Sequence, residues 1–276
     1  MFNGFMLDAY LAGTVIAVLA ALVGYFAILR GLTFAAHALP KVGFAGAAGA
    51  VLLKADPIIG LAVFAILGAL GMGTLGKRGR QDVAVALTLV AALGTGALFL
   101  VLVDNYANDA YALLFGQMVG ISRGQVLDTV ALGAAGIGLL LVMYRPLTFA
   151  SISKEVAQAR GIPVVRIETF FLVVMGVATA VTVPVVGVLL TFSLIVGPAA
   201  AASHLTHQPF KVIGLAACLA VGTVWASLAL AYITGWPIGF YVATISTLVY
   251  GGARLKAFLF QARMSRCQEV SDNADN

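Results

Sequence analysis

The sequence predicts an all-helical, polytopic membrane bundle. Of its 276 residues, only 10% are charged and 62% are hydrophobic, and the mean hydropathy is +1.05. A soluble globular domain carries about 25% charged residues, so an ordinary soluble enzyme is excluded. The uncharged runs 10–29 and 83–103 are long enough to cross a bilayer as helices. They lack the alternation typical of membrane β-strands, and a helix satisfies its backbone hydrogen bonds within one segment.

About nine apolar segments follow one another along the chain. The first is expected to be a retained helix rather than a signal peptide, because no clean cleavage site follows it and further apolar segments do. The sixth and seventh segments run together around Pro184 and Gly187. Two crossings, or one crossing with a re-entrant piece, both fit, which gives nine or eight transmembrane helices. The segments begin near Tyr10, Ala36, Ile58, Val83, Gln125, Thr169, Val188, Val212 and Ile238.

The basic residues predict the orientation of the bundle. With nine crossings, thirteen of the sixteen lysines and arginines fall on one side of the membrane, which should be the cytoplasmic side. The C-terminus would then be cytoplasmic, in a plasma or inner membrane. A single crossing for the sixth and seventh segments breaks this segregation and is therefore disfavoured. The same bias accounts for the net charge of +5 without nucleic acid as a partner. The thirteen are Arg30, Lys77, Arg78, Arg80, Arg145, Lys154, Arg160, Arg166, Lys211, Arg254, Lys256, Arg263 and Arg266.

One membrane domain is expected to make up almost the whole chain. We assign residues 1–262 to it and residues 263–276 to a polar cytoplasmic tail without fixed structure. The longest loop on the basic side, residues 144–166, contains a short polar helix that Gly161 and Pro163 should end. Small residues recur four apart in 43–50 and 68–76. They predict either tight helix packing or interfaces that slide during transport.

Few side chains in the sequence are candidates for catalytic groups or metal ligands. The sequence has no phosphate-binding loop, no H-E-x-x-H and no C-x-x-C, so we expect neither an enzyme nor an ATPase site. His204 and His207 share a helix-end segment, either as metal ligands or as solvated residues. His37 and Lys41 lie four residues apart with Pro40 between them. Ionisable residues inside a membrane usually mark a pathway; the alternative is that Lys41 extends to the interface and His37 begins a helix.

Four further stretches carry a resemblance to a known family. They are "YALLFGQMVGIS" (111–122), "SISKEVAQARGIPV" (151–164), "VVGVLLTFSLIVGPAAAA" (185–202) and "GWPIGFYVATISTLVYG" (235–251). They resemble the corresponding stretches of the ABC-3 permeases, which import zinc and manganese. The likeness runs from about residue 10 to residue 256, with Phe115, Gly116 and Pro198 at motif positions.

The resemblance implies a type II-importer-like permease. Two permease chains would form the pathway in the lipid bilayer, two cytoplasmic ABC ATPases would bind the ATP, and an extracytoplasmic metal-binding protein would deliver zinc, manganese or iron. This chain would bind no cofactor of its own. The coupling loop that contacts the ATPase would contain Ser153, Glu155, Ala157 and Gly161. Ser153 stands where the family usually has aspartate.

The chain departs from the family at the implied cation ligands. The family reads "GDTLAHASLLG", with an aspartate and a histidine four apart, and this chain has His37 and Lys41 at those positions. His37 can bind a metal, but a protonated lysine has no lone pair. At an effective dielectric constant of about 20, it repels a divalent cation 4 Å away by roughly 8 kcal/mol.

Two other interpretations therefore stay open. The first is a family-like subunit that moves an anion or a chelated metal, or that regulates another permease. The second is an ion-gradient-driven carrier, although neither repeated halves nor buried carboxylates are evident in the sequence.

Overall fold

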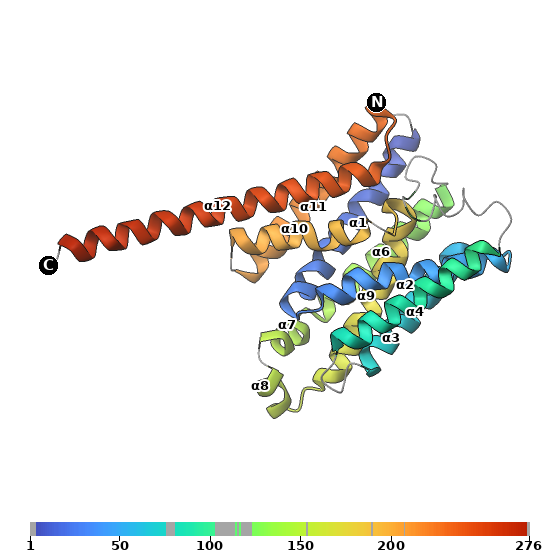
Figure 1. Ribbon diagram of the computed structural model, residues 1–276, viewed down its shortest axis with the longest axis horizontal. Helices are drawn as coiled ribbons and strands as arrows, with labels where there is room; N and C mark the ends of the chain where they lie inside the picture. The colour runs from blue at the N-terminus through green and yellow to red at the C-terminus, as the bar shows by residue number, and fades with distance from the viewer. Residues whose placement is uncertain are drawn as a thin grey trace.

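The computed structural model describes residues 4–75, 81–102, 114, 116, 123–152, 154–188, 190–206 and 208–274. These residues form helices, turns and loops, with no strand among them. Each of the nine expected apolar segments corresponds to one helix (Figure 1). The nine are α1 (Gly4–Leu29), α2 (Thr33–Leu52), α3 (Pro57–Leu75), α4 (Gln81–Val101), α6 (Arg123–Val142), α9 (Val164–Val186), α10 (Thr191–Leu205), α11 (Pro209–Thr234) and α12 (Ile238–Ala274).

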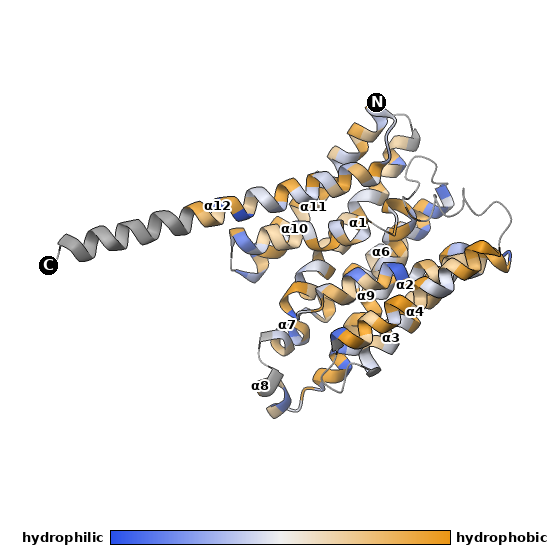
Figure 2. Ribbon diagram, viewed as in Figure 1, coloured by the Kyte–Doolittle hydropathy of each residue, from blue (hydrophilic) through white to orange (hydrophobic). Residues whose placement is uncertain are grey.

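The predicted all-helical membrane bundle is confirmed. Among the described residues, α1, α3, α4, α6, α9 and α11 are long and apolar enough to cross a bilayer, and α10 is a shorter apolar helix. Figure 2 shows that hydrophobic residues predominate along these helices, and many of them are exposed. Leu87 of α4 is 67% exposed and Leu127 of α6 is 70% exposed. A surface this apolar is suited to lipid.

The centre of the bundle is built on α1 and α9, the most deeply buried of the six candidate spans. Helix α1 contacts α6, α9, α10 and α11. Its approach to α10 is so close that a Cβ atom added at Gly24 would lie 1.8 Å from the Ile195 carbonyl oxygen. Side chains cannot occupy such a crossing, and small residues are the usual solution in membranes.

The first patch of small residues lies in a helix interface. A Cβ atom at Gly46 of α2 would lie 2.1 Å from the carbonyl oxygen of Gly60 in α3. From the second patch, Gly68 of α3 packs against the Val42 side chain of α2. The contacts support the packing interpretation of both patches.

The sixth and seventh segments are two separate helices. Helix α9 ends at Val186, and Gly187 follows it with a φ of +92°. Helix α10 begins at Thr191, whose hydroxyl donates to the Gly187 carbonyl oxygen at 2.7 Å. Glycine is favoured at such a φ because it has no Cβ atom.

Helix α12 extends well past the rest of the bundle (Figure 1). It continues to Ala274, into the segment for which no fixed structure was expected. Residues 263–274 include glutamine, glutamate and arginine, which are good helix formers. The division of the chain into a domain ending at residue 262 and a separate tail stays a prediction.

Candidate functional site

His37 and Lys41 lie in contact on one face of α2. The Lys41 Nζ atom and the His37 Nε2 atom form a hydrogen bond, as their spacing of four residues allows. Pro40 lies between them inside the helix and is buried. Proline lacks an N–H group, so it removes one backbone hydrogen bond from α2 next to the pair.

The His37 ring also packs against a neighbouring helix. It meets the Phe192 ring of α10 edge to face, with the ring centroids 4.9 Å apart and an angle of 84° between the planes. Its Nδ1 atom is buried and has no hydrogen-bond partner in the described part of the chain. Phe192 lies just after the break between α9 and α10. No sequence pattern distinguishes Phe192, because it is one apolar residue in an apolar run.

The pair does not form a complete metal site. Across the residues that the structure describes, no three or more histidine, cysteine, aspartate or glutamate side chains gather. A bare divalent cation at His37 would therefore find fewer than three such side chains among these residues. Zinc sites normally have three or four protein ligands, so the arrangement is suited to a hydrated ion or to a substrate that brings its own ligands.

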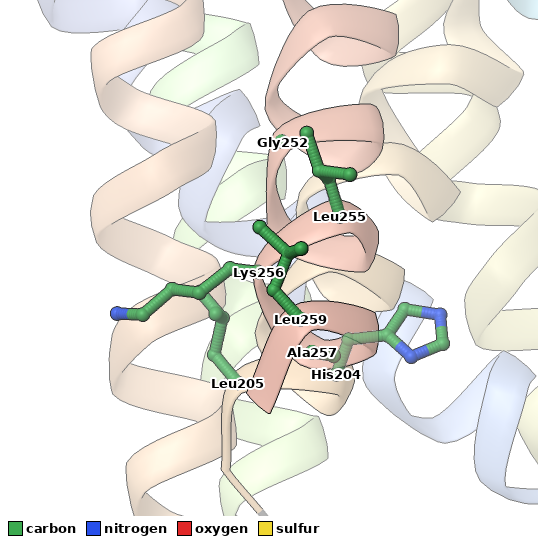
Figure 3. Close-up of a pocket in the computed structure, with 7 residues that line it drawn as sticks. All are labelled: His204, Leu205, Gly252, Leu255, Lys256, Ala257 and Leu259. Carbon is green, nitrogen blue, oxygen red and sulfur yellow. The ribbon is translucent and has the colours of Figure 1, made fainter. Parts of the chain in front are cut away.

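His204 lies elsewhere, in the last turn of α10. It lines an open cavity of about 620 Å³ between α10 and α12 (Figure 3). Figure 3 shows the His204 and Lys256 side chains pointing to opposite sides, and the other lining residues are apolar or glycine. His207 lies outside the described residues. His204 therefore stays an exposed side chain, with its ring centroid 5.6 Å from that of Tyr250.

The long loop 144–166 contains two short helices, α7 (Tyr144–Ile152) and α8 (Lys154–Ala159), and the expected coupling segment 153–161 includes α8 but not α7. Ala157 is fully buried, and Glu155 lies within α8. Gly161 follows with a φ of +74°, and the Ile162 N–H donates to the Ala157 carbonyl oxygen at 3.0 Å. The short helix ending at Gly161 is therefore present. Ser153 lies outside the described residues.

One family-motif position, Gly116, lies at the break between α9 and α10. A Cβ atom at Gly116 would lie 2.5 Å from the Val185 carbonyl oxygen, so the backbone of Gly116 packs directly on this break. Pro198 is buried within α10. Phe115 lies outside the described residues.

A comparison with protein families covers nearly all of these elements. The model of the ABC 3 transport family matches residues 3–257. The chain belongs to the ABC 3 transport family. The resemblance stated from the four sequence stretches is thus confirmed, and with it a multi-pass membrane permease rather than a soluble protein.

Relatives of this ABC 3 family chain have names that specify metals. The manganese transport system membrane protein MntC of Listeria innocua is 25% identical over 259 residues, which cover 93% of this chain and 91% of the relative. The high-affinity zinc uptake system membrane protein ZnuB of Haemophilus influenzae is 23% identical, over 82% of this chain and 87% of the relative.

Two solved structures share the fold of this ABC 3 family chain. PsaBC from Streptococcus pneumoniae in complex with Fab superimposes with a TM-score of 0.82 at 22% identity, covering 91% of each chain. An inward-facing conformation of a putative metal-chelate type ABC transporter has a TM-score of 0.73 at 14% identity, covering 91% of this chain and 85% of the other.

Proposed function

We propose that this chain is the membrane-spanning permease subunit of an ATP-driven importer of divalent metal ions, with manganese, zinc and iron as candidates. The observation that carries the proposal is the ABC 3 family match over residues 3–257. Relatives named for manganese and zinc transport support the choice of substrate class. The sequence contains no phosphate-binding loop, so a separate cytoplasmic ATPase hydrolyses the ATP.

The proposed assembly has three other kinds of subunit. A second permease chain completes the pathway, an extracytoplasmic metal-binding protein delivers the ion, and the ATPase binds α8 at the cytoplasmic face. The C-terminus lies on the same side, as the distribution of basic residues favours. We place the pathway beside His37 and Lys41, because ionisable groups at membrane depth usually face a pathway or a partner.

A second candidate is the import of a chelated or anionic substrate. The observation that favours it is the Lys41 ammonium group bonded to His37, without three or more metal-ligating side chains gathered anywhere in the described residues. A cation at membrane depth favours an anionic group. A chelate would also bring its own ligands, which the described residues do not gather.

Reconstitution into liposomes with a candidate ATPase and binding protein tests the proposal. ATP hydrolysis and uptake are measured with free Mn²⁺, Zn²⁺ and Fe²⁺, and in parallel with Fe³⁺ bound to a catecholate chelator. Stimulation by a free divalent ion supports the first candidate. Stimulation by the chelate alone supports the second. Failure of the chain to associate with any ATPase contradicts both.

The His37→Ala variant is expected to lower the uptake of free divalent metal at least tenfold. Loss of a metal-ligating contact worth about 1.4 kcal/mol corresponds to that factor. His204→Ala is the matched control, since His204 is exposed at the end of α10 and should leave uptake unchanged. Equal uptake by both variants contradicts a pathway at His37.

The Glu155→Lys variant is expected to weaken the complex with the ATPase at least tenfold, measured by co-purification and by titration of the purified subunits. The change reverses a charge on α8, and like charges across an interface cost several kcal/mol. Asp82→Lys is the control, because it makes the same reversal at an exposed position in the first turn of α4. A complex that Glu155→Lys leaves intact contradicts the assignment of α8 as the ATPase contact.

A further inference from the structure

A buried arginine joins three parts of the bundle where α1 ends. Arg30 follows α1, and its side chain is only 1% exposed. Its Nη1 atom donates to the Ser151 hydroxyl of α7 at 3.2 Å, and its Nη2 atom lies 3.8 Å from Oε2 of Glu168 in α9. Ser151 in turn donates to the Leu147 carbonyl oxygen at 2.6 Å. The sequence showed Arg30 only as one of many basic residues.

An aromatic layer lies beside this polar cluster and connects the same three helices. The Phe26 ring of α1 meets the Tyr144 ring of α7 at 6.0 Å and the Phe171 ring of α9 at 6.1 Å, both edge to face. Such ring pairs add to the stability gained from burial alone. Because α1, α7 and α9 meet in both layers, one helix cannot shift without disturbing the other two.

Because Arg30 is buried, the loss of either of its contacts would be costly in free energy. A buried charge is costly unless it is paired. Burial lowers the pKa of Arg30, and the charge of Glu168 acts in the opposite direction. A guanidinium group has a planar set of donors that can bond two partners at once. If α7 moved away, the buried Arg30 would lose its hydrogen bond to Ser151 without water to replace it. The turn that contains Arg30 is therefore expected to move with α7.

The same turn begins the helix that carries the candidate pathway residues. Arg30 and Gly31 form the turn, α2 starts at Thr33, and His37 and Lys41 lie in its first turns. Ser151 lies at the end of α7, and α8, which we propose as the ATPase contact, begins at Lys154. A short chain of packed groups therefore connects α8 with α2.

We propose that Arg30 is a positioning residue that transmits movement of α7 and α8 to α2, through its contacts with Ser151 and Glu168. The inference rests on the proposed function, because α8 must move when the ATPase closes. Rigid helices that shift together are a known means of transmitting such a change. The coupling predicts that ATP hydrolysis and movement of α2 can be separated by mutation at Arg30.

The experiment measures both quantities in the complex of full-length permease and ATPase. Cys218 and Cys267 are first changed to serine, and Leu53→Cys, at a position 79% exposed at the far end of α2, carries an environment-sensitive fluorophore. The change in emission between the nucleotide-free and the ATP–vanadate states reports movement of α2, without any need to know the substrate. Steady-state ATP hydrolysis is measured on the same samples.

Arg30→Ala is expected to keep basal ATP hydrolysis and to reduce the nucleotide-dependent emission change at least about fivefold, the lower end of typical coupling effects. Arg30→Lys should restore part of the change, because it restores one charge but not the two-partner geometry. Arg166→Ala is the control, since Arg166 is an exposed arginine near Glu168 in α9 and should behave as wild type.

A second variant keeps the test decisive if Arg30→Ala fails to fold. Ser151→Ala removes one hydroxyl and leaves the Arg30–Glu168 pair, and it should also reduce the emission change while hydrolysis continues. A full emission change in Ser151→Ala, or in a folded Arg30→Ala, overturns the inference while the proposed function stands. A wild-type chain that binds no ATPase overturns the proposed function instead.

Discussion

Gly24→Ala is expected to abolish stable folding of the bundle. The added Cβ atom would lie 1.8 Å from the Ile195 carbonyl oxygen and 2.8 Å from its carbonyl carbon. Both atoms belong to the backbone of α10, so no side-chain rotation can relieve the overlap. Overpacking of a core by flexible groups costs about 1–3 kcal/mol, and a backbone contact this short requires α1 and α10 to separate. The measurements are the yield of monodisperse protein in detergent and its thermal unfolding.

Gly138→Ala provides the matched control. Gly138 lies on the exposed face of α6, and no atom lies within 4 Å of the position that its Cβ would take. Alanine is more favourable than glycine within a helix by about 1 kcal/mol, so this variant should be as stable as wild type or more so. A Gly24→Ala protein with a wild-type unfolding temperature contradicts the close approach of α1 and α10.

Lys41→Met is expected to increase the apparent affinity for a free divalent ion at least tenfold. Methionine keeps an unbranched side chain and removes the ammonium group, whose repulsion of a divalent ion at 4 Å is roughly 8 kcal/mol at an effective dielectric constant of about 20. Screening by water reduces the effect, but about 1.4 kcal/mol is enough for a factor of ten. His37 also loses its hydrogen-bond partner at Nε2, which leaves this nitrogen available to a metal.

Uptake by liposomes at increasing metal concentration gives the apparent KM. Lys256→Met is the control, because Lys256 is exposed on α12 and its replacement should not change the KM. If Lys41→Met instead abolishes uptake of the iron–catecholate complex and gains nothing for free ions, the substrate is the chelate and Lys41 binds its negative charge.

The sequence predicted the fold far better than the site. Apolar runs determined where each of the nine helices lies, because a helix in lipid must satisfy its own backbone. Gly161 was predicted to end a short loop helix, since its lack of a Cβ atom permits the left-handed φ found there. The predicted boundary at residue 262 had a weaker basis, because polar composition alone does not prevent a helix such as α12 from continuing.

The candidate site could not be predicted fully, because it is formed by contacts between segments that lie far apart in the sequence. The spacing of His37 and Lys41 indicated a shared face of α2, but Phe192 reaches His37 only because α10 packs on α2. Similarly, Arg30, Ser151 and Glu168 come together from three elements. Local sequence patterns report the neighbours within a helix, and they contain no direct signal for such tertiary contacts.

The break between α9 and α10 leaves α10 too short to cross a bilayer on its own. Helix α10 has 15 residues, which gives a length of about 22 Å, whereas the hydrocarbon core of a bilayer is about 30 Å thick. Val185, Val186 and Val188 at the break are at most 2% exposed, so protein rather than lipid encloses the irregular backbone there, as membrane proteins require. Because protein encloses this break, the backbone can leave helical geometry at membrane depth, and α10 does not have to cross the bilayer on its own.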